Sequence, residues 1–493
     1  MTASPSGNLG DIVKTDGAGY LDQRDGRLHA PAKIDRLAAR LAAGTVARGW
    51  RRGDRVAILA ENGIPFTIAY LGLMRAGLVP VPVNYRLTPE TVAYILRDCG
   101  AVAVLHDAAR AAMLPDGVEA IDITSGVDTL LAERPTAPIV PVPGEIAEIL
   151  YTSGSTGRPK GVPLSHDGQL WALDRFLAIS SHAAERTVIS APAYHMNGLF
   201  FTTVSLALGY FAVSMPRFDA RGYLEAAAEH RCTILSGIPT MFALMARERD
   251  LLARLDLTSV KDIVIGSAPL TQALIDRVKA IFPAAAIRNS YGTTETGPAM
   301  FGPHPQGLAR PPLALGYPYP DVEWRLVGGA SPNEGMLETR TPATLAGYLN
   351  LPGVSAERLR DGWYATGDVL RRDAQGFFHF IGRGDDMFVC GGENVYPGEV
   401  EKMLERHPAV LEAAVVATED EIKGAIPVAF IVCAPGKTVD AGELKQFALA
   451  NGPAYSHPRA FAFLDKMPVN GAHKVDRGVL KPQAARLVAE LGR

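Results

Sequence analysis

The chain has 493 residues, of which 47% are hydrophobic and 20% are charged. These proportions exclude a disordered or fibrous protein, and at about 150 residues per domain the length predicts several domains. The 49 Lys and Arg residues nearly balance the 52 Asp and Glu residues, for a net charge of −3. This balance excludes a basic footprint for nucleic acid and a polybasic membrane patch.

Helix and strand patterns alternate in the first third of the chain. Apolar residues repeat at helical spacing in three segments, at residues 34–41, 65–75 and 89–98. Thr88 and Pro89 open the last segment in an arrangement typical of a capped helix. Short apolar runs typical of buried strands separate the helices, at residues 55–60, 79–83 and 102–105. The alternation predicts parallel βαβ units.

A linker with prolines at positions 135, 138, 141 and 143 ends this first part, since each proline fixes φ and removes a donor. Beyond it, an apolar strand is predicted at residues 146–151, and further strand and helix signals run from residue 233 to residue 282. Short strands and turns follow from about residue 311 to 381, and a compact α+β pattern begins near residue 399.

Residues 187–216 contain no charged side chain and are long enough to cross a membrane. Pro192, Asn197 and Gly198 interrupt the stretch, so we expect a buried strand, a loop and a core helix, and no stable membrane insertion. The four cysteines are far apart and form no CxxC pair, which predicts free thiols in a reducing, cytoplasmic compartment. The first ten residues lack the basic and apolar parts of a signal peptide.

The most informative stretch, TSGSTGRPKG, follows the strand predicted at residues 146–151. Its hydroxyls and its ammonium are donors for phosphate oxygens, and its glycines let the backbone approach an anion. Pro159 stands where a Walker A loop needs glycine, so this is a different phosphate loop; a Ser/Gly-rich surface turn is the alternative. The candidate phosphate-binding residues are Thr152, Ser153, Gly154, Ser155, Thr156, Gly157 and Lys160.

This stretch resembles the phosphate loop of the adenylate-forming enzymes, which include acyl- and aryl-CoA synthetases, beetle luciferases and peptide-synthetase adenylation domains. Five further stretches resemble motifs of the same superfamily, in the same order. They are Gly266-Ser267-Ala268-Pro269, Tyr291-Gly292-Thr293-Thr294-Glu295, Tyr364-Ala365-Thr366-Gly367-Asp368, Gly382-Arg383-Gly384-Asp385-Asp386, and Gly391-Gly392-Glu393-Asn394-Val395-Tyr396-Pro397. The order and spacing of six motifs, rather than any single one, carry the resemblance.

The resemblance implies that ATP, Mg²⁺ and coenzyme A are used. It implies that Glu295 binds the metal and that Thr294 donates to the α-phosphate, while Tyr291 lies against adenine. A carboxylate is a suitable hard ligand for Mg²⁺. Asp368 and Arg383 match the ribose-binding motif, and their acceptor oxygens and forked donors suit a diol. Without the motif order, Glu295 and Asp368 would more simply be a surface carboxylate and a strand-turn residue.

The last motif of the superfamily usually ends in Gly-Lys. The run from Pro468 to Lys474 fits this motif and makes Lys474 the catalytic lysine by resemblance, but His473 replaces the glycine. Histidine reaches the backbone conformations of glycine only at a cost. Many relatives also have lysine where His457 stands, so we expect a CoA-phosphate contact there to be weaker or supplied elsewhere.

His195, in a stretch that matches the superfamily's motif near the acyl group, is expected where the carboxylate meets the CoA thiol; a satisfied core histidine is the alternative. No Asp lies in residues 187–216 to hold a substrate ammonium, which disfavours an amino acid. Malonate-specific relatives carry Arg where this chain has Ser290, with Arg288 two residues earlier. The apolar residues Phe200, Phe201, Met241 and Met300 either form a wall for the acid or are ordinary core.

The sequence thus predicts an α/β adenylate-forming fold, with an AMP- and acyl-binding region at residues 1–384 and a small mobile α+β domain at residues 385–493 that turns about Asp385. The implied activity is ATP-dependent ligation of an apolar medium-chain or aromatic, hydroxycinnamate-type acid to CoA through an acyl-adenylate. A homodimer is compatible with the resemblance. The alternatives are a ligase that loads a carrier protein, a luciferase-like oxygenase and a binding module with a decayed site.

Overall fold

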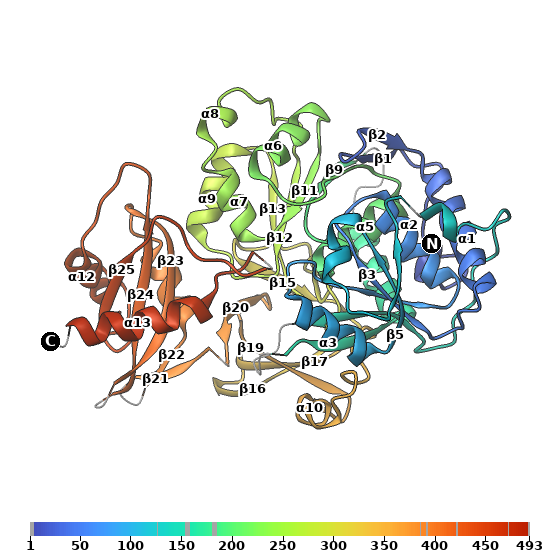
Figure 1. Cartoon of the computed structure of the whole chain (residues 1–493). Helices are drawn as coiled ribbons and strands as arrows, with labels where there is room; N and C mark the ends of the chain where they lie inside the picture. Colours follow the sequence, from blue (N-terminus) through green and yellow to red (C-terminus); the bar gives the residue numbers. More distant parts are fainter. Residues whose placement is uncertain are drawn as a thin grey trace.

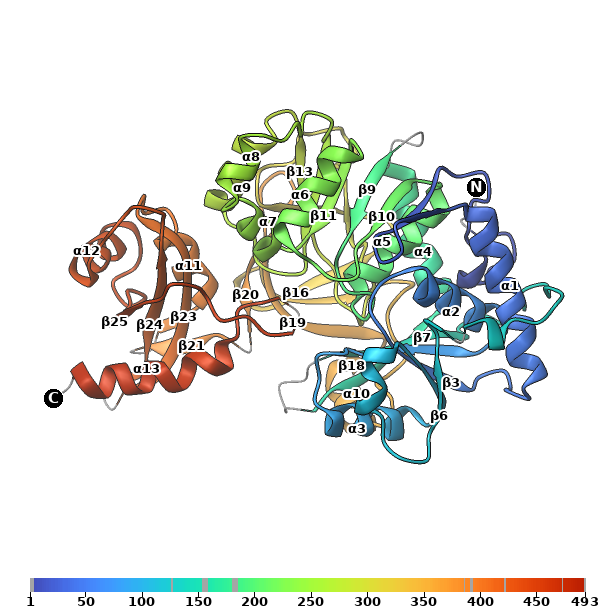
Figure 2. The same ribbon diagram turned by 45° about the horizontal axis from the view of Figure 1, so that its top comes forward.

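The computed structural model describes residues 4–125, 127–152, 158–179, 185–384, 386–390, 393–420, 423–471 and 473–491. A large region formed by the first 383 residues lies beside a smaller C-terminal part, which is orange to red in Figures 1 and 2. The predicted phosphate-loop residues 153–157, the predicted hinge residue Asp385, and Gly391 and Gly392 lie outside the described residues.

The first third of the chain forms a parallel sheet with the strand order β4-β3-β5-β6. Its strands are β3 (Arg55–Leu59), β4 (Val79–Pro82), β5 (Ala101–His106) and β6 (Glu119–Asp122). The helices of this part are α1 (Pro31–Ala47), α2 (Ile64–Arg75) and α3 (Pro89–Cys99). The Thr88 hydroxyl accepts a hydrogen bond from the backbone N–H of Thr91, as its capping position predicts. The predicted βαβ pattern is confirmed.

A second sheet has the order β13-β12-β11-β9-β10-β1-β2 and is parallel except for the pair β1–β2. Its strands are β1 (Gly19–Asp22), β2 (Arg27–His29), β9 (Arg186–Ile189), β10 (Phe211–Ser214), β11 (Ile234–Gly237), β12 (Asp262–Gly266) and β13 (Ala286–Ser290). The helices near it are α4 (His166–Ile179), α5 (Met196–Leu208), α6 (Ala220–Glu229), α7 (Pro239–Met245), α8 (Arg249–Leu252) and α9 (Gln272–Ile281). The uncharged stretch 187–216 therefore forms β9, α5 and β10, as expected.

No helix in the part of the chain that the structure describes is long and apolar enough to cross a membrane.

Two antiparallel units complete the large region. The hairpin of β7 (Ile146–Thr152) and β8 (Lys160–Ser165) packs beside β4. A sheet of order β14-β15-β20-β19-β17-β16, with β18 beside β19, follows. Its strands are β14 (Phe301–Gly302), β15 (Ala314–Pro318), β16 (Glu323–Ser331), β17 (Glu334–Arg340), β18 (Leu359–Arg360), β19 (Trp363–Arg372) and β20 (Phe378–Arg383), and α10 (Pro352–Arg358) precedes β18.

The C-terminal part is an α+β unit with its own core. Its sheet has the order β22-β21-β24-β23, and β25 pairs in parallel with β24. The elements are β21 (Phe388–Cys390), β22 (Glu393–Val395), α11 (Pro397–Leu404), β23 (Val410–Asp420), β24 (Gly424–Cys433), α12 (Ala441–Asn451), β25 (Ala460–Phe463) and α13 (Arg477–Leu491). The red segment between β25 and α13 leaves this unit and reaches towards the large region in both views (Figures 1 and 2).

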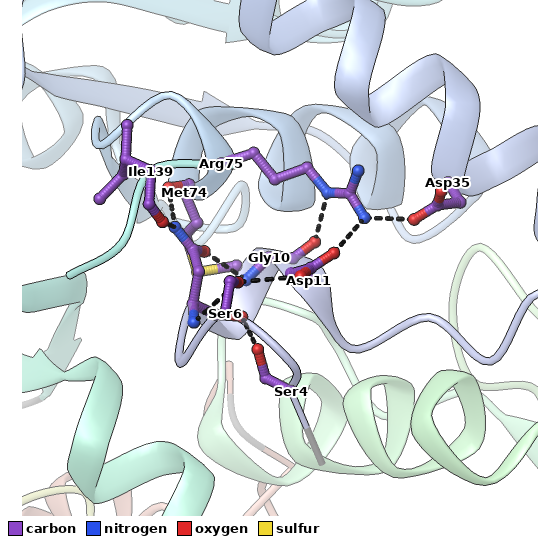
Figure 3. Close-up of polar contacts among 9 residues, drawn as sticks. Ser4, Ser6, Gly10, Asp11, Asp35, Met74, Arg75 and Ile139 are labelled. Atoms are coloured by element: carbon purple, nitrogen blue, oxygen red, sulfur yellow. Dashed lines mark hydrogen bonds and ion pairs between the residues drawn. The ribbon is translucent and has the colours of Figure 1, made fainter. Parts of the chain in front are cut away.

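A buried guanidinium fixes the N-terminal segment to α1 and α2 (Figure 3). Arg75, at the end of α2, donates through Nε to the carbonyl of Gly10 at 2.7 Å and forms ion pairs with Asp11 and Asp35. The amide of Asn8 donates to the carbonyls of Met74 and Ile139. Because the cation is paired and hydrogen-bonded, its burial is tolerated, and the segment before β1 is held in place.

Candidate active site

A cavity of about 1130 Å³ lies between the large region and the C-terminal part, and both parts line it. It collects most of the described candidate residues, which come from seven separate stretches of the sequence. Those that line it are Thr152, Lys160, His195, Ser267, Ala268, Pro269, Tyr291, Gly292, Thr293, Thr294, Glu295, Asp368, Arg383 and Lys474. Gly266 and Glu393 are described but are not among its lining residues; Glu393 is exposed at the start of β22.

The adjacent strands β19 and β20 bring Asp368 and Arg383 into register. Nη1 of Arg383 donates to Oδ1 of Asp368 at 3.0 Å, and the Tyr291 hydroxyl donates to Oδ2 at 2.5 Å. Burial raises the pKa of Asp368, although Arg383 and Tyr291 both oppose this shift. A carboxylate held in this way keeps lone pairs free for further donors, as a ribose diol requires.

The strip 266–269 follows β12 at the point where β12 pairs with β13. A Cβ on Gly266 would lie only 2.9 Å from the carbonyl oxygen of Ser290, so glycine is needed for this close approach. Ser267 then adopts φ +65°, in the left-handed region that non-glycine residues rarely occupy. The chain turns sharply at this point, and residues 267–269 form one wall of the cavity.

A tight turn presents Thr294 and Glu295 to the cavity. Thr293 forms a bridge with Gly297, and its hydroxyl lies 2.8 Å from that of Thr296. A Cβ on Gly292 would lie 2.5 Å from the carbonyl oxygen of Gly297, so the end of the turn packs closely against its first residues. The side chain at position 295 is therefore held by backbone geometry rather than by a long flexible loop.

Two tyrosines that the sequence did not single out for a role support Glu295. The Tyr348 hydroxyl donates to Oε1 of Glu295 at 3.0 Å and lies 2.9 Å from the Tyr364 hydroxyl. The Lys160 ammonium lies 5.5 Å from the centre of the Tyr348 ring. Tyr348 thus connects the carboxylate to the base of the phosphate loop, and Tyr364 belongs to the motif that contains Asp368.

The predicted phosphate loop lies in the sequence between β7 and β8, whose adjoining ends are in register. Thr152, the last residue of β7, pairs with Lys160, the first residue of β8, and both line the cavity. The hairpin therefore places Lys160 in the cavity beside Tyr348, whose hydroxyl binds Glu295.

His195 occupies the N-cap position of α5 without a capping hydrogen bond from its side chain, and its ring lies 4.6 Å from the Tyr194 ring, centre to centre. Within the described structure its Nε2 is buried and has no hydrogen-bond partner. Burial, together with the nearby Lys474, His473 and Arg86, lowers the pKa of His195 to about 4. The imidazole is therefore neutral at physiological pH and faces the cavity with an unused nitrogen, unlike a satisfied core histidine.

Lys474 enters the cavity from the C-terminal part on a short hairpin, in which Val469 forms a bridge with Val475. Its side chain stays accessible to the solvent in the cleft, while the surrounding protein lowers its pKa by desolvation; Asp368 and Glu295 oppose that shift. Lys474 thus lies close enough to Asp368 and Glu295 to interact with both carboxylates.

The apolar end of the cavity contains three of the four predicted wall residues. Phe200, Phe201 and Met241 line it, whereas Met300 is fully buried in the core beside β15 and β19 and so is ordinary core. Arg288 is paired with Asp262 and is not among the lining residues. Within the described strand β13, no arginine side chain therefore points into the cavity, where it could bind the second carboxylate of a short dicarboxylic acid.

His457, where many relatives have lysine, is buried and turned inwards. It lies 2.5 Å from the carbonyl of Ala454 through Nδ1, and Arg459 contacts its ring nitrogens. This position therefore presents no cationic side chain to solvent for a phosphate.

Known proteins of one enzyme family are similar to this chain. The profile of the AMP-binding enzyme family matches residues 30–349, and that of the AMP-binding enzyme C-terminal domain matches residues 399–474. Feruloyl-CoA synthase of Amycolatopsis sp. is 33% identical, over 91% of this chain and 93% of its own length. Fatty acid–[acyl-carrier-protein] ligase ScoC of Streptomyces coeruleorubidus is 31% identical, over 93% and 92%. ATP-bound MatB from Rhodopseudomonas palustris matches with a TM-score of 0.87 and 27% identity, over 98% and 99%.

The fold and the site define an adenylate-forming enzyme. The chain belongs to the AMP-binding enzyme family, and the predicted resemblance, fold class and enzyme class, an AMP-forming acid–thiol ligase of the acyl-CoA synthetase type, are confirmed.

Proposed function

We propose that this enzyme joins an apolar medium-chain or aromatic, hydroxycinnamate-type carboxylic acid to coenzyme A, through an acyl-adenylate formed from ATP. The observation that carries the proposal is the convergence of Lys474, Asp368 and Glu295 on one cavity that also has an apolar end. A ligase of this kind needs cations and donors around a phosphate beside a pocket for an apolar acid.

In the first step the substrate carboxylate attacks the α-phosphorus of ATP, and pyrophosphate leaves. Both reactants are anions, so positioning and charge neutralisation carry the step. Lys474 supplies a cation at the reacting carboxylate and the α-phosphate, and Thr294 donates a hydrogen bond there. Asp368 and Arg383 hold the ribose, while Tyr291 and residues 267–269 border the adenine.

The residues around Glu295 fit Mg²⁺. Among the described residues no cluster of three or more ligating side chains exists, but Mg²⁺ commonly binds one or two carboxylates together with substrate phosphates. Glu295 would hold the ion beside Lys160 and the phosphate loop, and Tyr348 fixes the orientation of its carboxylate. The bound ion would neutralise phosphate charge and favour departure of pyrophosphate.

In the second step the CoA thiol attacks the acyl-adenylate carbonyl and AMP leaves. The small domain would turn about Asp385, withdraw Lys474 and bring the loop that contains Gly391, Gly392 and Glu393 beside the thiol path. Lys474 and His473 both lower the pKa of His195 in the present pose, so their withdrawal raises it. His195 then becomes a better acceptor for the thiol proton during this step.

Two features support an apolar monocarboxylic acid. Phe200, Phe201 and Met241 line the cavity, and Arg288 is already paired with Asp262.

The nearest alternative is a ligase that loads a carrier protein, because one relative bears that name. A luciferase-like oxygenase would perform the same first step but release light or oxidised product. Four free thiols favour a reducing, cytoplasmic location.

The test is a panel of octanoate, benzoate, cinnamate, ferulate and malonate with ATP and Mg²⁺. Pyrophosphate and AMP are measured with CoA, with an acyl carrier protein and with neither. We expect turnover with CoA and an apolar acid, and none with malonate. Turnover with carrier protein but not CoA would assign the alternative, and no ATP–pyrophosphate exchange with any acid would contradict the proposed function.

A further inference from the structure

The hairpin that carries Lys474 needs an unusual backbone conformation at the residue before the lysine. The Asn470 N–H donates to the carbonyl of Lys474 at 2.8 Å, and the His473 N–H donates to the carbonyl of Asn470 at 2.9 Å. The Lys474 N–H donates to Oδ1 of Asn470 at 3.1 Å. Short hairpin loops of this kind often end in a left-handed residue, and His473 has φ +58°. Glycine adopts this conformation freely, whereas histidine is strained in it.

The His473 side chain reaches across to the large region. Nη1 of Arg86 lies 3.0 Å from Nε2 of His473, and because a guanidinium only donates, this nitrogen accepts and the imidazole is neutral. The same ring meets the edge of Phe218, with ring centres 6.1 Å apart. Arg86 follows β4 and Phe218 follows β10, so one side chain contacts segments that follow strands of two different sheets of the large region. A glycine at position 473 makes neither contact.

A second contact docks the same hairpin beside His195. The Tyr194 hydroxyl donates to the carbonyl of Gly471 at 3.4 Å, and the Tyr194 ring packs against His195. A Cβ on Gly471 would lie 3.3 Å from Nδ2 of Asn84, so the hairpin also lies close to the loop that holds Arg86. The hairpin therefore contacts the N-terminal region at Gly471 through its backbone and at His473 through its side chain.

We propose that His473 is a positioning residue, which ties the lysine hairpin to Arg86 and Phe218 and so holds Lys474 in the pose for adenylation. The inference rests on the proposed function in that Lys474 acts in the first step. The tie must break when Lys474 withdraws, so it stabilises the first pose and not the second. The backbone strain at position 473 is tolerated because the side chain makes this contact.

The test compares four variants with the wild-type enzyme. His473→Gly relieves the backbone and removes the tie, and Arg86→Met removes its partner. In His473→Asn, the asparagine tolerates the left-handed region, and its carboxamide oxygen can accept a hydrogen bond from Arg86. Asp361→Gly is the matched control, since Asp361 also has a positive φ, +52°, but is exposed in the turn between β18 and β19.

We expect His473→Gly and Arg86→Met each to slow ATP–pyrophosphate exchange ~5-fold, on the scale of one solvent-exposed hydrogen bond. The double variant should be no slower than either single variant, because both remove the same contact. His473→Asn should recover part of the rate. Thioester formation from the supplied acyl-adenylate should stay within ~2-fold of wild type, and Asp361→Gly should change neither half-reaction.

Amide hydrogen exchange provides a readout that needs no turnover. Residues 84–87 and 469–475 should exchange faster in His473→Gly and Arg86→Met than in the wild type, and at wild-type rates in Asp361→Gly. Three results would each contradict the proposed tie. They are unchanged hydrogen exchange in both segments, additive losses of rate in the double variant, and equal losses of rate in the two half-reactions. A wild-type enzyme that activates no acid would instead contradict the proposed function, while the hydrogen-exchange result would still decide whether the tie exists.

Discussion

The hydroxyl of Tyr291 and the carboxylate of Asp368, 77 positions apart in the sequence, are joined by a 2.5 Å hydrogen bond. Arg383 binds the other oxygen of the same carboxylate, so Asp368 is held from both sides in a buried position. Tyr291 therefore orients the proposed ribose-binding residue, in addition to its proposed place beside the adenine. The two roles are separable, because only the first needs the hydroxyl.

Tyr291→Phe should weaken ATP binding while leaving the ring in place. The lost hydrogen bond removes one of the interactions that oppose the raised pKa of Asp368, so that pKa should rise further. We expect kcat/KM for ATP to fall ~10-fold, and the acidic limb of its pH profile to move to higher pH. Steady-state kinetics between pH 5 and 9 measure both effects. An unchanged profile with an unchanged KM for ATP would assign the hydroxyl a purely structural role.

Lys474→Ala should slow acyl-adenylate formation by ~10²–10³-fold, the scale for losing one preorganised charged donor. Thioester formation from supplied acyl-adenylate should suffer far less, because the proposed second pose withdraws Lys474. The two half-reactions are measured separately, as ATP–pyrophosphate exchange and thioester release. Equal losses in both would contradict the two-pose scheme. Lys466, in the exposed turn before the hairpin, provides the matched control as Lys466→Ala.

Glu295→Gln keeps the size of the side chain, and its amide oxygen can still accept from Tyr348. We expect a higher Mg²⁺ requirement and a slower first step, with a thermal midpoint close to that of the wild type. Tyr348→Phe should show a weaker version of the same phenotype, since it loosens Glu295 without removing its charge. Titration of exchange activity with Mg²⁺ is the measurement. A variant that melts earlier but turns over normally per folded molecule would make Glu295 structural.

The sequence predicted the βαβ units because their apolar runs and capping signals are local. Thr88 at the start of α3 is an example, since both the residue and its bonded partner lie within one turn. Most of the described candidate residues lie around one cavity, as the shared function of their motifs predicts, although Gly266 and Glu393 do not line it.

Contacts between segments that are far apart in the chain could not be predicted from the sequence. Nothing local indicates that Tyr348 reaches Glu295, or that Arg86 meets His473 across 387 positions. The sequence allowed two interpretations of Met300, a pocket wall or ordinary core, because an apolar residue beside a site motif fits both equally well. Only packing separates them, and it places Met300 under the antiparallel sheet. The substitution of His473 for glycine was visible, but its compensating partner was not.

The last prediction concerns Glu148, a carboxyl group buried in β7 between apolar neighbours. The Tyr70 hydroxyl donates to its Oε2 at 2.9 Å, and Gln169 nearby has a buried amide nitrogen without a partner in the described structure. Burial raises the pKa of Glu148 from 4.5 to about 7. The folded state therefore binds this proton more tightly than the unfolded state, and stability falls as the pH rises from about 4.5 to 7.

Glu148→Gln removes the ionisation and keeps an oxygen for Tyr70. We expect its thermal midpoint to exceed that of the wild type at pH 8, where the wild type must bury a charge, and the difference to shrink at pH 5. Glu405 in α11's C-terminal turn also has its pKa raised to about 7 by burial, so a residual pH dependence should remain in the variant. Calorimetry at several pH values decides the matter: a stability difference that does not change between pH 5 and 8 would mean that Glu148 keeps the same protonation state across that range.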